Sequence, residues 1–304
     1  MVKIFVSIIN FNGEDDTIEC LRSLDKISKN AFDLEAVVID NGSRDVFKAE
    51  ARDYRNFSLH IVRSEENLGF AGGQNLGIKY ALSKGADFVL VLNNDVMLDK
   101  EFLVNLLATF SQKNDCAVVC PKIYFAKGYE FHKDRYKDDE RGKVIWYAGG
   151  VMDWKNVIAY HKGVDKVDKG QFNKVSETEF ATGCCMMVKK DVFDSVGFFD
   201  EKYFLYYEDS DFSMRAKAKG INIYFQPESV IWHLNAGSAG GSGSSLQDYY
   251  ITRNRLLFGL KYAGVRAKFA LIRESAKLLI RGRRWQKRAV FDYYLGNLGK
   301  GSYK

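Results

Sequence analysis

The sequence predicts an α/β fold built on a mostly parallel sheet, and three observations support that class. The chain has 304 residues, 46% hydrophobic and 28% charged, which suits a globular protein with a large core. Apolar, β-branched runs alternate with amphipathic helical patterns through the first third, as in βαβ units. Polar residues follow these runs repeatedly, at the sheet edge where parallel sheets bind ligands.

The first third contains four candidate strands, at residues 3–10, 34–40, 59–64 and 86–92. Helix-length segments separate them, so we expect a sheet that is buried on both faces. The polar strand ends are residues 10–13, 40–45, 67–75 and 93–95. Because the carboxyl ends of parallel strands meet at one edge, these residues are expected to gather there.

The pattern loosens between residues 122 and 180. The charged segment KGYEFHKDRYKDDERGK predicts an exposed insert, and the short alternating runs after it predict a small β-rich region. Helical patterns return at residues 188–196 and 208–219, and INIYF then predicts a short strand. The glycine-serine run at residues 236–245 predicts a break before a helical, basic C-terminal region.

The net charge of +6 is unevenly distributed. Between Ile251 and Arg288 there are 12 Lys and Arg against Glu274 alone, a net +11, which leaves −5 for the rest. The sequence shows neither a signal peptide nor an apolar run of about 18 residues, so a cytoplasmic protein is expected. The five cysteines lack metal-site spacing and are expected to be reduced thiols.

A helix over residues 265–284 would carry an apolar stripe beside a basic one. The apolar positions are Val265, Phe269, Ile272, Ala276 and Leu279, and the basic ones are Arg266, Arg273, Lys277, Arg281 and Arg284. This combination is typical of a helix that lies on a membrane surface. A nucleic-acid-binding patch and a helix packed against the core are the alternatives.

Three strand ends carry side chains suited to a nucleotide. Asp40 can accept a hydrogen bond from a base imide or a ribose hydroxyl, whereas Ser43 or Asp45 nearby can instead cap a helix. The loop ENLGFAGGQNLG departs from GxGxxG spacing, and its small residues permit either close approach of a ligand or a tight helix start. At the end of LNND, Asp95 can hold a divalent cation together with a pyrophosphate.

Two later features also suggest chemistry. His233, in VIWHLNAG, is either a ligand or a satisfied buried histidine. In FLYYEDSDF, Glu208, Asp209 and Asp211 follow an apolar wall that raises the proton affinity of a carboxylate, as a general base requires. An acidic first turn of a helix is the alternative, and Glu208 or Asp211 can turn toward solvent, the helix N-terminus or Arg215.

The series SIINFN, VVIDNGSRD, NLGFAGGQNLG, LNND, ATGCCMMVKKDVFDSVGFFDEKYFLYYEDSDFSMRAKAKG and WH resembles the family 2 glycosyltransferases, in particular their rhamnosyltransferase-like branch. The resemblance covers roughly residues 3 to 260 in the family's order. It implies a GT-A fold over residues 1–245, with a nucleotide-sugar-binding half (1–121) and an acceptor-binding half (122–245). The helical, basic region 246–304 follows.

The same resemblance implies the site residues. Asp209 is the expected general base, Asp95 the metal ligand of a DxD-type motif, and His233 a second contact to the metal or diphosphate. The first acid of that motif is replaced by Asn93, which leaves the contact at that position open. Asp40 is expected to contact the base. The nucleotide-binding residues implied are Asn10, Asn12, Asp40, Asn41, Asn67, Gly72, Gly73, Asn75 and Asn94.

The implied enzyme uses Mg²⁺ or Mn²⁺ and inverts the anomeric carbon of dTDP-rhamnose or a UDP-hexose. Its expected partners are that donor, a lipid-linked glycan acceptor of the O-antigen type and, through the C-terminal region, the anionic inner face of the cytoplasmic membrane, but not nucleic acid. One alternative is a nucleotidyltransferase, although NFNGEDD lacks its basic, glycine-rich phosphate loop. A non-catalytic sugar- or nucleic-acid-binding protein is the other.

Overall fold

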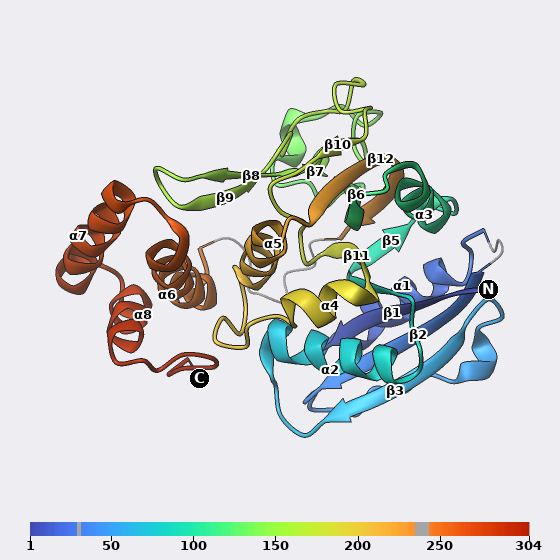
Figure 1. Ribbon diagram of the computed structural model, residues 1–304, viewed down its shortest axis with the longest axis horizontal. Coiled ribbons are helices and arrows are strands. Elements are labelled where there is room, and N and C mark those ends of the chain that lie inside the picture. The colour runs from blue at the N-terminus through green and yellow to red at the C-terminus, as the bar shows by residue number, and fades with distance from the viewer. Residues whose placement is uncertain (29–31, 235–242, 304) are drawn as a thin grey trace.

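The computed structural model describes residues 1–28, 32–234 and 243–303, and Figure 1 shows a twisted central sheet with helices on both faces and a helical C-terminal unit at one side. The strands are β1 (Val2–Asn10), β2 (Phe32–Asn41), β3 (Ser58–Ser64), β4 (Phe88–Asn93), β5 (Val96–Leu98), β6 (Cys116–Phe125), β7 (Ile145–Tyr147), β8 (Gly150–Asp153), β9 (Ile158–His161), β10 (Ser176–Glu177), β11 (Cys185–Lys189) and β12 (Asn222–His233). The α-helices are α1 (Glu14–Leu24), α2 (Gly69–Ser83), α3 (Phe102–Gln112), α4 (Lys190–Val196), α5 (Glu208–Ala218), α6 (Ser245–Tyr262), α7 (Val265–Arg281) and α8 (Arg284–Tyr294).

The N-terminal part of the sheet is parallel, as the sequence predicts. β1 pairs with β2 on one side and with β4 on the other, and β3 pairs with β2. α2 covers one face of these strands and α1 the other (Figure 1). One detail differs: in the described segment between β2 and β3, the chain forms only the 3₁₀ turn η1 (Ala51–Asp53) instead of an α-helix. β3 is therefore an edge strand, and its side chains are only partly buried.

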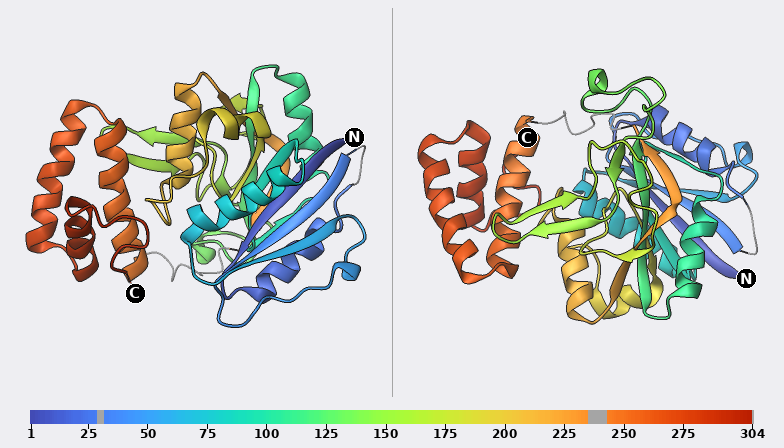
Figure 2. Two further views of the ribbon diagram at one scale, coloured as in Figure 1. Left: turned by 60° about the horizontal axis from the view of Figure 1, so that its bottom comes forward. Right: turned by 90° about the horizontal axis from the view of Figure 1, so that it is seen from above.

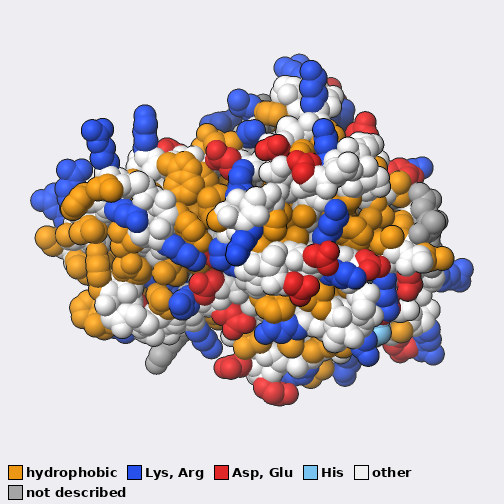
Figure 3. Space-filling model, in the orientation of Figure 1, with side chains coloured by type: hydrophobic (Ala, Val, Ile, Leu, Met, Phe, Trp, Pro, Cys, Tyr) orange, Lys and Arg blue, Asp and Glu red, His pale blue; other side chains and the backbone are white. Residues whose placement is uncertain are grey.

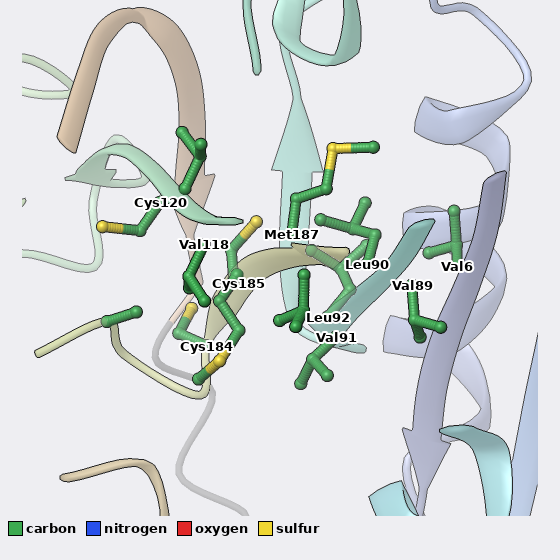
Figure 4. Close-up of a cluster of buried hydrophobic side chains, with 14 of the residues drawn as sticks. Val6, Val89, Leu90, Val91, Leu92, Val118, Cys120, Cys184, Cys185 and Met187 are labelled. Atoms are coloured by element: carbon green, nitrogen blue, oxygen red, sulfur yellow. The ribbon is translucent and has the colours of Figure 1, made fainter. Parts of the chain in front are cut away.

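The sheet continues beyond β4 with mixed strand directions. β11 runs antiparallel to β4, with Cys185 opposite Leu92 and Met187 opposite Leu90. Figure 4 shows these side chains packed in one layer of the core. β6 then pairs with β11 and with β12, so the sheet is continuous across residue 121, which lies inside β6.

β12 is longer than the INIYF run that predicts it. It contains two register shifts against β6, one of them between Gln226 and Val230. Pro227 lies in that interval and has no backbone N–H to donate to the ladder. The strand resumes afterwards and ends at His233.

The region between β6 and α4 matches the expected insert and β-rich segment. Residues 127–143 are mostly exposed and contain only turns and the 3₁₀ segment η2 (Lys133–Arg135) among their described elements. The β8–β9 hairpin extends toward the C-terminal helices in both views of Figure 2. There, Arg255 of α6 donates to the carbonyl of Asn156 at 2.6 Å, and the Tyr207 hydroxyl donates to the carbonyl of Val157 at 3.1 Å.

The C-terminal unit is helical, as expected, with two differences. The predicted helix over residues 265–284 ends at Arg281, because the chain turns at Gly282, where a Cβ atom would lie 2.5 Å from the Leu278 carbonyl oxygen. Residues 236–242 of the predicted glycine-serine break lie outside the described residues, and α6 begins directly after the N-cap Ser244. In the described parts of the chain, every helix is too short or too polar to cross a lipid bilayer.

Candidate active site

An open pocket of about 520 Å³ lies at the carboxyl end of β1. It is formed by the loop after β1, the first turn of α1 and the loop after β2. Its lining residues are Asn10, Asn12, Gly13, Glu14, Asp15, Asp16, Arg44 and Asp45. The volume is within the range that binds a small molecule such as a nucleoside.

Two asparagines fix the loops that form this pocket. The Oδ1 atom of buried Asn10 accepts hydrogen bonds from the Gly13 amide at 3.2 Å and from the Thr17 hydroxyl at 2.9 Å. Asn12 has a φ of 55°, a left-handed conformation that asparagine tolerates better than most residues. Its Oδ1 atom accepts from the Arg44 amide at 2.8 Å, which joins the β1 loop to the β2 loop.

Asp40, near the end of β2, is fully buried. Its carboxylate accepts from the Ser43 amide at 3.2 Å, the Phe47 amide at 3.1 Å and the Arg63 guanidinium at 2.5 Å. Burial alone would raise the pKa of Asp40, but hydrogen bonds, led by those from Ser43 and followed by Phe47 and Arg63, outweigh it and lower the pKa. Asp40 therefore holds the loop after β2 as an ionised carboxylate, and its contact with a base stays a prediction.

Asn41, Asn67 and Asn75 lie around the start of α2. The Asn41 amide donates to the Asn67 side chain at 3.1 Å and receives a hydrogen bond from the Leu68 amide. Buried Asn75 donates to the Phe199 carbonyl and accepts from the Phe199 amide, both at 2.9 Å. These residues connect the α2 loop to its neighbours and do not line the 520 Å³ pocket.

The glycines of α2 mark close contacts of that helix. A Cβ atom on Gly73 would lie 2.3 Å from Ile9, and one on Gly72 would lie 2.8 Å from Leu68. A Cβ atom on Gly77 would lie 2.0 Å from the Ser7 hydroxyl. The small residues therefore let α2 pack directly against β1, and the structure favours this interpretation of the glycine loop over the approach of a ligand.

Asp95 and His233 meet where β4 and β12 end. Asp95 Oδ1 lies 3.2 Å from His233 Nε2, and both residues are largely buried. His233 is held by pairing with Val96 of β5, and its ring lies 4.7 Å from the Trp146 ring. Next to Asp95, the Asn94 amide donates to the Thr17 hydroxyl at 2.9 Å. This bond connects the end of β4 to the helix that borders the pocket.

The Asp95–His233 pair suits a divalent cation. Carboxylate oxygen is the preferred protein ligand of Mg²⁺ and Mn²⁺, and imidazole nitrogen is a common further ligand. Among the described residues, neither ring nitrogen of His233 forms a hydrogen bond, although both are buried. Within the same residues, no group of three or more His, Cys, Asp or Glu side chains is arranged around a metal position. A cation held here would therefore take its remaining ligands from water and from phosphate oxygens.

Asp209 is the second residue of α5 and is half-buried. Its carboxylate accepts from the Gly183 amide at 2.9 Å and from the Ser210 amide at 2.6 Å. Burial raises the pKa of Asp209, and these hydrogen bonds offset the rise only in part. A side chain on Gly183 would approach Phe70 of α2 to 2.9 Å, so glycine is needed for this close contact with α2.

Asp209 and the end of β4 that leads to Asp95 are both hydrogen-bonded to the residues just before β11. Gly183 donates to Asp209, and the carbonyl of the next residue, Cys184, accepts from the Asn93 amide at 2.9 Å. Burial, and next the negative charge of Asp95 with a smaller effect from Asp209, raise the pKa of the Cys184 thiol. The two acids thus come from different elements, and the charge of each raises the pKa of the same buried thiol.

Three directions were expected for Glu208 and Asp211: solvent, the helix N-terminus and Arg215. Neither side chain turns toward solvent. Glu208 is 5% exposed and Asp211 is fully buried. Asp211 accepts from Arg215 and from Lys261 of α6, both at 2.7 Å, so only the predicted contact with Arg215 is present. Burial, with the charge of Asp209 adding to it, raises the pKa of Glu208. Of the three acids, Asp209 is the most accessible to a substrate.

The sequence analysis missed several residues of this region. Arg44 and the acids of the first turn of α1 line the pocket, and Arg63 pairs with Asp40. Arg44 stands inside the quoted VVIDNGSRD run, so its position gave a usable signal. Arg63 lies 23 residues after Asp40, and only the parallel pairing of β3 with β2 brings the two together.

Comparison with known proteins identifies the family of the chain. Residues 5–197 match the sequence profile described as Glycosyl transferase family 2. The chain is 29% identical over 254 residues to a low-salt glycan biosynthesis hexosyltransferase of Haloferax volcanii, across 83% of this chain and 74% of that protein. It is 26% identical over 270 residues to a dTDP-rhamnosyl transferase of Shigella flexneri, across 84% of this chain and 79% of that protein.

Solved structures show the same fold. The crystal structure of GalNAc-T7 with UDP, GalNAc and Mn²⁺ superposes with a TM-score of 0.66 at 16% identity. The superposition covers 97% of this chain and 55% of that one. At such low identity the likeness concerns the fold alone, and it confirms the fold expected from the sequence.

Proposed function

The chain belongs to glycosyl transferase family 2, and it is a nucleotide-sugar-dependent glycosyltransferase of GT-A fold. From that membership we propose that it transfers a sugar, with inversion, to a hydroxyl group of a lipid-linked cell-surface polysaccharide. The observation that carries the proposal is that adjacent residues before β11, Gly183 and Cys184, are hydrogen-bonded to half-buried Asp209 and to Asn93, two residues before Asp95 of the Asp95–His233 pair. A possible base and a possible cation site are thus connected through one short segment, and Asn94 connects the cation site to the helix that borders the nucleoside-sized pocket.

The charge of the pocket supports binding of the nucleoside part of the donor. Four of the lining residues are acidic, and Arg44 is the basic one among them. Phosphate groups would be repelled by these acids, whereas a base and ribose hydroxyls can donate hydrogen bonds to them. The diphosphate then extends toward Asp95 and His233. The name of one relative favours dTDP-rhamnose as the donor, and that of the other favours transfer of a hexose, which we propose is carried by UDP.

The chain's own residues provide for binding and proton transfer. Asp209 takes the proton of the acceptor hydroxyl while the hydroxyl oxygen forms a bond to the anomeric carbon. The bond from that carbon to the diphosphate breaks at the same time, and the diphosphate leaves with the bonding electrons. A single displacement of this kind inverts the anomeric configuration. Mg²⁺ or Mn²⁺ bound by Asp95 and His233 would neutralise negative charge on the diphosphate leaving group. The Mn²⁺ in the GalNAc-T7 structure supports this choice of metal.

A panel of nucleotide sugars tests the donor. We expect dTDP-rhamnose or a UDP-hexose, added with Mn²⁺, to raise the melting temperature by several degrees, because a ligand at 100 times its Kd stabilises a protein by ~2.7 kcal/mol. Differential scanning fluorimetry measures the shift, with GDP-mannose as the comparison donor. A shift with GDP-mannose alone would reject this donor class. Release of pyrophosphate from a nucleoside triphosphate and a sugar 1-phosphate would instead identify a nucleotidyltransferase.

We further propose that the outer surface of α7 and α8 docks on the anionic inner face of the cytoplasmic membrane. The predicted stripe of α7 is exposed, with Phe269 69% accessible, and Ile280 beside it is 74% accessible. α8 adds exposed Phe291 and Leu295. The buried side of α7 is instead formed by Leu271 and Ser275. In Figure 3 hydrophobic side chains gather over these helices, with Lys and Arg at their border.

The charge pattern favours lipid over a second copy of the chain or nucleic acid. All five predicted basic positions, from Arg266 to Arg284, are exposed on or next to α7. An apolar surface bordered by cations matches the interface of an anionic bilayer, where each nearby basic residue contributes ~1 kcal/mol. Nucleic acid would leave the apolar side chains in water. A lipid-linked acceptor would be presented at the same surface.

Flotation of the full chain with phosphatidylglycerol vesicles tests this surface. The double variant Phe269→Asp with Ile280→Asp is expected to lose most of its flotation, because it places two charges in the bilayer interface. Ile61→Asp, at an exposed position on β3, is the matched control and should float as the wild type does. Equal flotation of the double variant and the wild type would reject the surface. Binding to RNA but not to vesicles would identify a nucleic-acid patch.

A further inference from the structure

The segment before Asp209 adopts an unusual backbone conformation. Phe204, Tyr206 and Tyr207 have φ values of 65°, 69° and 73°, in the left-handed region that bulky side chains rarely occupy. Asp209 follows two residues later, at the start of α5. Such a backbone persists only where its surroundings hold it. The position of the base therefore depends on what fixes this segment.

Two adjacent residues of α6 hold it. The Asn254 side-chain amide contacts the carbonyls of Tyr203, Leu205 and Tyr206, each at 2.8 Å. The Arg253 guanidinium donates to the carbonyl of Tyr203 at 3.0 Å and to that of Lys202 at 3.2 Å. Arg253 Nε also donates to the Asn254 Oδ1 atom at 3.0 Å, which turns the amide nitrogen toward the carbonyls. Both side chains are fully buried.

The burial of Arg253 is costly and calls for a function. Burial lowers the pKa of its guanidinium. The guanidinium carbon lies 5.3 Å from the centre of the Tyr249 ring and 5.1 Å from that of the Tyr250 ring. Its third carbonyl contact is with Gly299 at 2.7 Å, near the end of the chain. One side chain thus joins the base segment, α6 and the C-terminal residues. Hydrophobic packing alone would not need a buried cation here.

We infer that Asn254 and Arg253 are positioning residues for Asp209, an inference that rests on the proposed role of Asp209 as the base. They fix the left-handed segment Phe204–Tyr207, and the end of that segment sets the direction in which the first turn of α5 begins. A second connection supports this arrangement: Asp211 of α5 accepts from Lys261 and Tyr262 of α6. Helix α6 thus contacts the base region at two places, whereas the Asp95–His233 pair belongs to the sheet.

The test compares kinetic constants and donor affinity in the full-length chain. Asn254→Ala should lower kcat by ~10²-fold, because a small displacement of a catalytic group is enough for such a loss. The donor Kd should stay within about twofold, since the pocket belongs to the β1 and β2 loops. The acidic limb of the pH profile should move as the surroundings of Asp209 change. Arg253→Lys keeps the positive charge but loses the planar set of N–H donors of the guanidinium, and it should also lower kcat.

Arg255→Ala is the matched control. It lies on the same helix and also loses hydrogen bonds, but these go to Asn156 and Glu274. Its kcat should be unchanged. The inference fails if Asn254→Ala keeps the wild-type kcat and pH profile. If Asn254→Ala does not fold, the same result for Arg253→Lys overturns the inference. It also fails if Arg255→Ala loses as much activity, or if donor affinity falls in parallel with kcat.

A double variant separates this inference from the assignment of the base. If Asn254 acts through Asp209, adding Asn254→Ala to Asp209→Asn should cause less than about a twofold further loss. Multiplicative losses would show that Asn254 acts elsewhere and would overturn the inference. Wild-type activity of Asp209→Asn alone would reject the base itself. A slow Asp209→Asn with an unaffected Asn254→Ala would reject only the positioning residues.

Discussion

Asp209→Asn is expected to lower kcat by at least ~10²-fold while donor and metal affinities stay near those of the wild type. The amide keeps the shape of the side chain but cannot take the proton of the acceptor hydroxyl. The Gly183 amide, which donates to the carboxylate at 2.9 Å, can still donate to the amide oxygen. Single-turnover transfer, with calorimetry for the donor Kd, measures the two effects separately.

Glu208→Gln is the control for this substitution. Burial and the adjacent charge of Asp209 raise the pKa of Glu208 and so favour its neutral form, which an amide imitates. A much smaller loss of kcat is therefore expected. If Asp209→Asn transferred sugar at the wild-type rate and Glu208→Gln did not, the base would be Glu208.

Asp95→Ala is expected to abolish transfer and to weaken Mn²⁺ binding. The substitution removes the carboxylate that lies 3.2 Å from His233, and a lone imidazole is a poor site for a hard cation. Neutralisation of a diphosphate leaving group by a metal contributes several kcal/mol to catalysis. Calorimetric titration of Mn²⁺ in the presence of UDP gives a readout that does not depend on activity.

Asp191→Ala, an exposed position on α4, is the control for Asp95→Ala and should bind Mn²⁺ normally. EDTA should inactivate the wild type, and added Mn²⁺ or Mg²⁺ should restore it. Full activity in EDTA would contradict metal dependence. Equal Mn²⁺ affinity of Asp95→Ala and the wild type would place the cation elsewhere.

The strands of the parallel part of the sheet could be predicted because their burial is continuous. β1, β2 and β4 are covered on both faces and therefore read as uninterrupted apolar runs. The structure of the link between β2 and β3 could not be predicted, because its buried residues Phe47, Tyr54 and Phe57 do not follow a helical period. Pro227 hid the full length of β12, since a single chain gives no sign that pairing resumes after a break.

The site could be predicted only as far as local sequence determines it. Asp95 and Asp209 stand at element ends that the sequence marks, and the structure connects the segment Gly183–Cys184 to Asp209 and to Asn93. Contacts across long separations were not predictable. Asp40 is enclosed by Arg63, and Asn75 is bonded to Phe199 more than a hundred residues away. For the same reason the glycines of α2 suggested a ligand site as readily as helix packing.

Arg253 and Asn254 illustrate the same limit in the C-terminal unit. In the sequence Arg253 is one of the 12 basic residues of this region and Asn254 is a neutral residue beside it, so neither is marked as a buried contact. In the structure both are fully buried and contact a segment 48 to 51 residues earlier. The basic charge of the region therefore gave no information on the inner side of α6.

The pH dependence of kcat, compared between the wild type and Asp209→Asn, tests the central claim most directly. A base acts when ionised, so activity should fall as the pH drops through the pKa of Asp209, which burial places above the ordinary value for aspartate. The account predicts this acidic limb in the wild type and its absence from the residual activity of Asp209→Asn, with circular dichroism showing both proteins folded throughout. The same limb in both proteins would contradict the assignment of Asp209 as the base.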